Sequence, residues 1–186
     1  MSGFRALLDA NVLYPDVLRD LLVRLARHGV YRALWSEDIL AEVGRALGEN
    51  AAVSDIPRLL ALMRAALPDA IVECYADLVA TLTLPDPDDR HVLAAAIVSN
   101  AAVIVSCNER DFPAAALASY GLECQHPDTF LTHAYHYDAV AFTAAVREQR
   151  AAWRNPSVDV DALFDRYRTL GLAQVVALLE PHRSTL

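Results

Sequence analysis

Acidic side chains at four separate places in the sequence are the residues best suited to chemistry. Asp9 and Asp111 each follow a short apolar run, and Asn108 lies just before Asp111. Glu42 falls about two turns into a predicted helix, and Asp89 opens another. They form a cluster only if the fold brings them together. Two like charges about 4 Å apart repel by about 4 kcal/mol at an effective dielectric constant of about 20. Such a cluster therefore needs protons or a divalent cation, and oxygen ligands favour Mg²⁺ or Mn²⁺ over Zn²⁺.

Five short apolar runs are the elements that must position these side chains. They occupy residues 4–8, 31–35, 70–74, 102–106 and 122–125, and each indicates a buried strand. Helices are predicted between them, at about 15–28, 36–47, 54–67, 76–82 and 89–100. This alternation is typical of a parallel sheet covered on both faces, so we predict an α/β three-layer sandwich with about five strands. Ligands bind such sheets beyond the carboxyl ends of the strands.

The last third of the chain has a different pattern. Residues 131–186 carry no strand signal, and their apolar spacing predicts helices at about 138–152, 160–170 and 172–180. We therefore divide the chain into a sheet domain, residues 1–130, and a C-terminal helical extension, residues 131–186. The extension is expected to pack on the domain or on a partner, because its apolar stripes need burial. The predicted helix caps are Gly29, Ser36, Ser54 and Asp159.

Composition limits the class of protein further. The chain has 186 residues, 55% of them hydrophobic, and a formal net charge of −8. This favours a packed globular protein and argues against one that coats nucleic acid nonspecifically. Three cysteines suggest no disulfide framework. The N-terminus reaches Asp9 before a signal-peptide core can form, and no apolar run approaches the length of a transmembrane helix. We expect a cytoplasmic protein with no membrane contact.

Four segments carry a family resemblance by their combination and order. They are residues 7–13 (LLDANVL), Glu42, residues 86–96 (DPDDRHVLAAA) and residues 104–113 (IVSCNERDFP). Together they resemble the PIN-domain nucleases, and the VapC-type toxins of bacterial toxin–antitoxin pairs are the subgroup that they resemble most. The resemblance covers residues 4–130 and finds no comparable motif in residues 131–186.

The resemblance implies a PIN-like parallel sheet of five strands and an acidic metal site. Many members have an Asp where this sequence has Asn108, a neutral and weaker donor, so Asp111 is the expected fourth carboxylate. The expected catalytic and metal-binding residues are Asp9, Glu42, Asp89 and Asp111. The expected supporting residues are Asn11, Ser106 and Asn108. One or two Mg²⁺ or Mn²⁺ ions would bind there.

The function that the resemblance implies is hydrolysis of RNA phosphodiester bonds by a metal-dependent endoribonuclease, the toxin of a toxin–antitoxin pair. Its expected partners are RNA, a cognate antitoxin protein that blocks the site, and a second copy of the chain in a homodimer. Arg90 and Arg110 adjoin the acidic residues and are candidate substrate contacts. A further candidate basic rim comprises Arg19, Arg24, Arg27 and Arg32.

Two other functions remain as alternatives. One is a small-molecule phosphohydrolase on a similar sheet, but such enzymes carry a second Asp where this chain has Asn11. The other is a nucleic-acid-binding or scaffold module with weakened catalysis, which Asn108 supports. Single residues also have structural interpretations, because Asp9 and Asp89 could be helix caps and His91 could have a structural or solvent-facing role.

Overall fold

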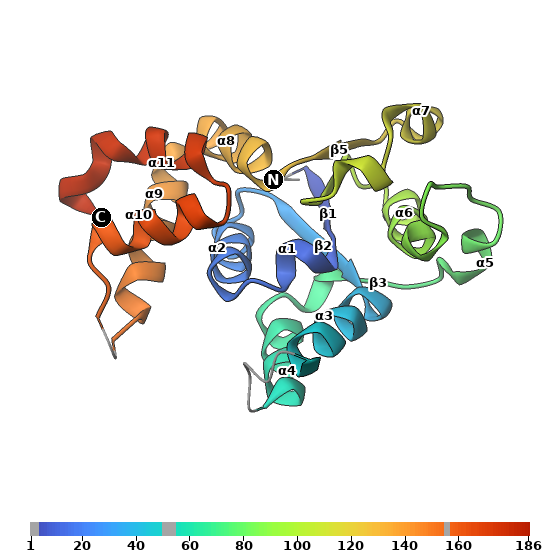
Figure 1. Cartoon of the computed structure of the whole chain (residues 1–186), viewed down its shortest axis with the longest axis horizontal. Helices are drawn as coiled ribbons and strands as arrows, with labels where there is room; N and C mark the ends of the chain where they lie inside the picture. The colour runs from blue at the N-terminus through green and yellow to red at the C-terminus, as the bar shows by residue number, and fades with distance from the viewer. Residues whose placement is uncertain (1–3, 50–54, 155–156) are drawn as a thin grey trace.

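The central sheet contains five parallel strands in the order β3-β2-β1-β4-β5. It is seen in a computed structural model that describes residues 4–49, 55–154 and 157–186 (Figure 1). The strands are β1 (Arg5–Leu8), β2 (Arg32–Ser36), β3 (Ile71–Val72), β4 (Val103–Val105) and β5 (Glu123–Gln125). The chain runs outward from β1 in one direction to β3, and later in the other direction through β4 to β5. Ligands bind at such a reversal, beyond the carboxyl ends of β1 and β4.

The observed strands are mostly shorter than the predicted ones. The third strand shows the largest difference, because it covers Ile71–Val72 instead of residues 70–74. Cys74 has a φ of 61°, in the left-handed region, so the extended backbone cannot continue through it. The second strand is shifted by one residue and ends at Ser36.

Helices flank the sheet on both sides, as the α/β three-layer prediction requires. They are α1 (Ala10–Leu13), α2 (Asp16–Arg27), α3 (Glu37–Glu49), α4 (Ile56–Ala66), α5 (Ala76–Val79), α6 (Arg90–Val98) and α7 (Ala114–Leu117). In Figure 1, α2 and α6 lie on opposite sides of β1 and β2. The short helix α1 was not predicted, because four residues are too few to show a helical period. Among the described residues, no helix is both long enough and apolar enough to cross a bilayer.

Of the N-terminal caps predicted for α3 and α4, only that of α3 can be compared with the structure. Ser36 caps α3, since its Oγ accepts a hydrogen bond from the Ile39 amide at 3.2 Å. Ser54 lies outside the described residues, and α4 is capped by Asp55, which accepts from the Arg58 amide at 3.0 Å. Both contacts satisfy backbone N–H groups that have no partner within the helix.

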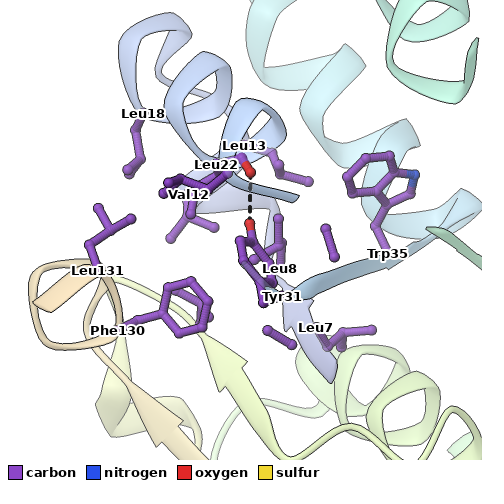
Figure 2. Close-up of a cluster of buried hydrophobic side chains, with 14 of the residues drawn as sticks. Leu7, Leu8, Val12, Leu13, Leu18, Leu22, Tyr31, Trp35, Phe130 and Leu131 are labelled. Atoms are coloured by element: carbon purple, nitrogen blue, oxygen red, sulfur yellow. Dashed lines mark hydrogen bonds between the residues drawn. The ribbon is translucent and has the colours of Figure 1, made fainter. Parts of the chain in front are cut away.

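The core lies between β1, β2, the first helices and the segment after β5 (Figure 2). Leu7 and Leu8 are neighbours in β1 and both are fully buried, as expected for a strand covered on two faces. Tyr31 is buried beside Phe130, with the rings edge-on and their centroids 4.9 Å apart. Its hydroxyl donates to the Leu22 carbonyl at 2.9 Å. The core therefore joins residues from both ends of the chain.

The C-terminal part is helical, as predicted, and lies beside α2 in Figure 1. Its helices are α8 (Pro127–Tyr137), α9 (Ala139–Ala152), α10 (Val160–Thr169) and α11 (Ala173–Leu179). The last three agree closely with the predicted ranges. The first, α8, was not predicted, and it runs across the predicted boundary between residues 130 and 131. The division into a sheet domain and an extension stays a prediction.

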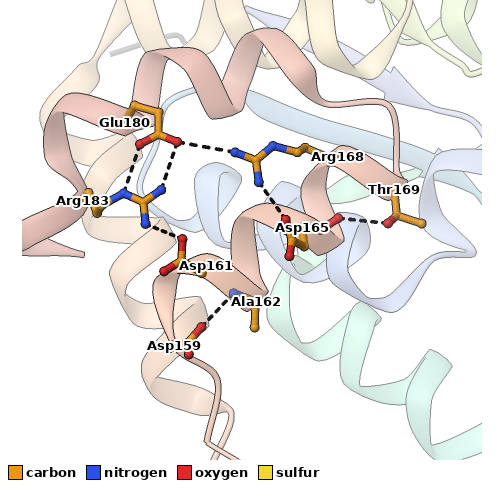
Figure 3. Close-up of polar contacts among 8 residues, drawn as sticks. All are labelled: Asp159, Asp161, Ala162, Asp165, Arg168, Thr169, Glu180 and Arg183. Carbon is orange, nitrogen blue, oxygen red and sulfur yellow. Dashed lines mark hydrogen bonds and ion pairs between the residues drawn. The ribbon is translucent and has the colours of Figure 1, made fainter.

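Exposed ion pairs link α10 to the 3₁₀ segment Glu180–Thr185 that follows α11 (Figure 3). Arg183 pairs with Asp161 and Glu180, and Arg168 pairs with Asp165 and Glu180. The predicted cap Asp159 accepts from the Ala162 amide at 2.8 Å. Exposed pairs of this kind each contribute about 1 kcal/mol or less. Buried contacts must therefore hold the helices in place.

Two buried polar residues supply such contacts. Gln149 on α9 is fully buried, donates to the Val17 carbonyl of α2 at 2.7 Å and accepts from the hydroxyl of Tyr167 on α10. Asp128 on α8 is also buried, and its carboxylate accepts from the amides of Gln174 and Val175 at 3.0 Å each. These bonds tie α9 to α2 and α8 to the start of α11.

Candidate active site

Asp9 is the most enclosed of the predicted site residues. It follows β1 directly, caps α1, and is 5% exposed. One carboxylate oxygen accepts from the Ala10 amide at 2.6 Å, and the other accepts from Asn11 Nδ2 at 2.7 Å and Ser106 Oγ at 2.8 Å. Burial nevertheless raises the pKa of Asp9, and the hydrogen bonds from Ser106 and Ala10 only partly offset it.

The strand register brings Asp9 to Ser106. Leu8 of β1 pairs with Val105 of β4, and the Asp9 amide donates to the Val105 carbonyl at 3.1 Å. The next residues, Asp9 and Ser106, therefore leave the sheet side by side. The sequence separates them by almost a hundred residues, so only the parallel pairing of β1 with β4 makes the contact.

Asn11 connects the two chain segments. Its Nδ2 donates to Ser106 Oγ at 2.9 Å as well as to Asp9, and its Oδ1 accepts from the Cys107 amide at 3.0 Å. Ser106 Oγ accepts in addition from the Asn108 amide at 3.0 Å. Asn11 and Ser106 thus form, with Asp9, a network in which each side chain has a partner of the required kind.

Asp89 lies at the start of α6 and is half-buried. Its pKa is raised to about 7, first by burial and then by the negative charges of Asp9, Asp111, Asp86 and Glu42. The part of this rise that comes from like charges shows that other carboxylates lie nearby. The structure therefore brings Asp89 close enough to the other candidate residues for their charges to act on one another.

Asn108 and Asp111 lie together after β4. Asp111 ends a short 3₁₀ helix, Glu109–Asp111, and its carboxylate accepts a hydrogen bond from Asn108 Nδ2. Asn108 is exposed, whereas Asp111 is half-buried and contributes to the raised pKa of Asp89. Asn108 therefore contacts the site through Asp111, and its backbone amide contacts Ser106.

Glu42 enters from α3, on the side of Asn11. It lines a pocket of about 330 Å³ together with Ala10, Asn11, Tyr14 and Ala46. Its charge contributes to the raised pKa values of Asp9 and Asp89. Glu42 Oε1 lies 2.9 Å from Nε2 of His91 on α6.

His91 is the site contact that the sequence analysis did not assign to function. Its raised pKa is a balance, because burial lowers it and the hydrogen bond and charge of Glu42 more than offset that effect. The contact joins α3 to α6, and its residues are far apart in the sequence. The only sequence signal was the position of His91 two residues after Asp89, in the first turn of the same helix.

The predicted basic residues differ in their surroundings. Arg110 is exposed on the 3₁₀ helix between Asn108 and Asp111, whereas Arg90 Nε donates to the Pro87 carbonyl at 2.8 Å. Arg19 is not part of a basic rim, because it is 8% exposed and its Nη1 donates to the carbonyls of Leu13 and Tyr14 at 2.7 and 2.9 Å. Its guanidinium caps the end of α1 instead.

A comparison with family models covers the part of the chain that contains these residues. The model described as the PIN domain matches residues 5–110, which is more than half of the chain. The chain belongs to the PIN-domain family. The match includes the segments around Asp9, Glu42 and Asp89 and ends one residue before Asp111. The resemblance drawn from the four segments is therefore confirmed.

The C-terminal helices of this PIN-domain protein match a second family model, described as the VapC50 C-terminal domain, over residues 127–181. Among curated proteins, the chain is 36% identical over 91 residues to "Putative ribonuclease VapC50" of Mycobacterium tuberculosis. That alignment spans 49% of this chain and 53% of the relative, so the chain spans about half the length of the curated relative that it matches. No solved structure matches the chain significantly.

The PIN family implies a divalent cation, and the donor types in this site suit one. Asp9, Glu42, Asp89 and Asp111 offer carboxylate oxygens, the ligands that Mg²⁺ and Mn²⁺ prefer. Burial raises the pKa of Asp89 most, and the neighbouring negative charges that add to this rise are charges that a cation would compensate. Within the described residues, however, no group of three or more Asp, Glu, His or Cys side chains is arranged so that it could hold a metal ion as it stands. The residues fit the ion by chemistry and charge, without forming a closed site.

Proposed function

We propose that this PIN-domain protein is a Mg²⁺- or Mn²⁺-dependent endoribonuclease and the toxin of a toxin–antitoxin pair. The observation that carries the proposal is that Asp89 lies within electrostatic reach of Asp9, Asp111 and Glu42, whose charges add to burial in raising its pKa to about 7. Four acidic residues from distant segments thus share one region at the carboxyl ends of β1 and β4. The name of the relative, which calls it a ribonuclease, supports RNA as the substrate.

The proposed roles follow from the contacts of each side chain. A bound divalent cation would lower the pKa of a water molecule and stabilise negative charge on the phosphate. Asp9, Glu42, Asp89 and Asp111 would hold the cation. Asn11 and Ser106 fix the orientation of the Asp9 carboxylate by donating to it at 2.7 and 2.8 Å. No side chain of the protein has to act as a covalent nucleophile in this scheme.

RNA binding needs local positive charge, because the chain carries a net charge of −8. Arg110 is exposed directly beside Asp111, and Arg90 follows Asp89. We propose these two residues as phosphate contacts. Their positive charge, together with the bound cation, would offset the repulsion between RNA and the acidic surface.

The proposed partners are a cognate antitoxin and a second copy of the chain. The VapC descriptions of the family model and of the relative support the antitoxin. Coexpression with a short neighbouring reading frame tests the antitoxin, because growth arrest by this protein alone should be relieved by its partner. Size-exclusion chromatography with light scattering tests the homodimer.

The catalytic proposal is tested by incubating purified protein with a mixed RNA substrate in Mg²⁺ and mapping the cleaved ends. Asp9→Asn and Asp89→Asn should each lower the cleavage rate by about a hundredfold or more, because each removes a charged cation ligand. Excess EDTA should abolish cleavage, and Mn²⁺ should restore it.

Asp88→Asn is the matched control, because Asp88 is the exposed neighbour of Asp89 and offers its backbone amide to Asp86. It should retain cleavage close to that of the wild type. A wild-type protein that leaves RNA intact but binds it would support the scaffold alternative. Hydrolysis of a chromogenic phosphate ester in place of RNA would support the phosphohydrolase alternative.

A further inference from the structure

The Glu42 carboxylate lies where the negative charges of other site carboxylates repel it. Its side chain is 29% exposed, and its charge acts on Asp9 and Asp89. Rotation of this flexible side chain toward solvent would relieve the repulsion between the carboxylates. A hydrogen-bond donor is therefore needed to keep the Glu42 carboxylate near the other carboxylates.

Arg45 and His91 both contact the Glu42 carboxylate, but the two contacts differ in distance and in solvent exposure. Arg45 Nη2 lies 3.7 Å from Oε1, and the Arg45 side chain is 68% exposed. His91 Nε2 lies 2.9 Å from the same oxygen, and its side chain is only 12% exposed. The distance and enclosure of His91 make it the contact that restrains Glu42. A carboxylate only accepts hydrogen bonds, so Nε2 of His91 must carry the hydrogen.

The other ring nitrogen of His91 supports this assignment. Nδ1 is buried and finds no hydrogen-bond partner within the described residues. The imidazole therefore makes its one side-chain hydrogen bond to Glu42. Burying an imidazole with one nitrogen unpaired costs free energy. If position 91 served packing alone, an apolar side chain there would be more stable.

We infer that His91 is a positioning residue, which holds the Glu42 carboxylate toward Asp9 and Asp89 through its Nε2–H group. The inference rests on the proposed function, because it matters only if Glu42 helps to bind the cation. The start of α6 then has two roles, since Asp89 offers a carboxylate and His91 orients a second one from α3. Loss of a residue that orients a ligand typically weakens metal binding about 10- to 100-fold.

The test is an isothermal calorimetric titration of the full chain with Mn²⁺ in the absence of RNA. His91→Asn, which is too short to reach Glu42, should weaken Mn²⁺ binding about tenfold. His91→Gln should stay within about threefold of the wild type, because its amide nitrogen can take the place of Nε2 as a donor. Arg45→Ala is the matched control and should change the affinity by no more than about twofold, since its ion pair is exposed.

A double-mutant cycle separates positioning from a general structural effect. In a Glu42→Ala background, His91→Asn should cause little further loss, because the acceptor is already gone. An equal loss in both backgrounds, or tighter Mn²⁺ binding by His91→Asn, would overturn the inference. If the wild type itself binds no Mn²⁺, the proposed function fails as well, so the two failures are distinguishable.

One measurement needs no substitution and so does not depend on the folding of a variant. Nitrogen-15 NMR of the His91 imidazole should show hydrogen on Nε2. A ring that carries its only hydrogen on Nδ1 cannot donate to Glu42, and that result would also overturn the inference.

Discussion

At the scale of single residues, burial raises the pKa values of both Asp9 and Asp89, but what accompanies burial differs between them. Asp9 has three hydrogen-bond donors, yet burial outweighs them and its pKa is raised. Asp89 is only half-buried and has no side-chain capping bond to its helix, and neighbouring carboxylates add to the effect of burial. Both residues therefore favour the charged form less than they would in water. Their ionisation lowers the free energy of unfolding of the folded protein.

Asp89→Asn should stabilise the metal-free protein at neutral pH. Because the pKa of Asp89 rises from 3.8 to about 7 on folding, the folded chain keeps a proton that the unfolded chain releases. This contribution to stability is lost as the pH rises from about 4 to about 7. The variant should therefore gain about 1 kcal/mol at pH 8, after allowance for solvent screening, or about 2–4 °C in melting temperature.

The measurement is thermal unfolding in EDTA at pH 4 and pH 8, monitored by circular dichroism. The difference between variant and wild type should be small at pH 4 and largest at pH 8. Asp88→Asn serves again as the exposed control. A variant that is less stable than the wild type at pH 8 would show that Asp89 stabilises the fold rather than straining it.

At the scale of elements, α8 and α11 are joined by a cap that comes from another helix. Asp128, in the first turn of α8, accepts from two amides in the first turn of α11, those of Gln174 and Val175. A helix usually takes its N-terminal cap from the residue that precedes it, but Leu172 has no such side chain. The start of α11 is therefore fixed only when α8 is in place.

Asp128→Ala should loosen α11 more than any other helix. It leaves two amides without their acceptor, at a cost of about 1–3 kcal/mol. Hydrogen exchange of the Gln174 and Val175 amides should become about tenfold faster or more. Gln174→Ala is a suitable control, because its exposed side chain takes no part in the cap. Unchanged exchange in Asp128→Ala would mean that apolar packing alone orders α11.

At the scale of the whole molecule, the C-terminal helices and the sheet share one core. Phe130 of α8 packs on Tyr31 beside β2, and Gln149 of α9 bonds to α2. Helix α2 in turn follows α1, which carries Asn11 and is capped by Arg19. The C-terminal helices therefore contact α2, the helix next to the site, although their described residues include none of the candidate ligands.

Gln149→Ala should destabilise the whole chain and not only its C-terminal part. It removes the bond to the Val17 carbonyl and leaves the Tyr167 hydroxyl buried without its acceptor, which costs about 1–3 kcal/mol. Urea unfolding should show one transition at a lower midpoint. Gln174→Ala should leave the midpoint unchanged, and two separate transitions in Gln149→Ala would show that the helices and the sheet unfold independently.

The parts of the fold that could be predicted are those with a strong local pattern. The apolar runs of β1 and β4 and the long helix α9 have such patterns. Helix α1 was missed because it has only four residues, and β3 was predicted too long because it ends at Val72, shortly before Cys74 takes a positive φ. Helix α8 was missed because its buried apolar residues, Phe130, Leu131 and Ala134, span less than two helical turns. So short a run does not reveal a helical periodicity.

The sequence by itself determined which donors the protein offers: carboxylates at Asp9, Glu42, Asp89 and Asp111, and polar neighbours at Asn11 and Ser106. It also determined that strands and helices alternate, since hydrophobic period is a local property. Only the tertiary structure decided which of these groups meet. The β1–β4 register brings Ser106 to Asp9, and the approach of α6 to α3 brings His91 to Glu42. Such contacts depend on packing between distant segments, which no local spacing in the sequence records.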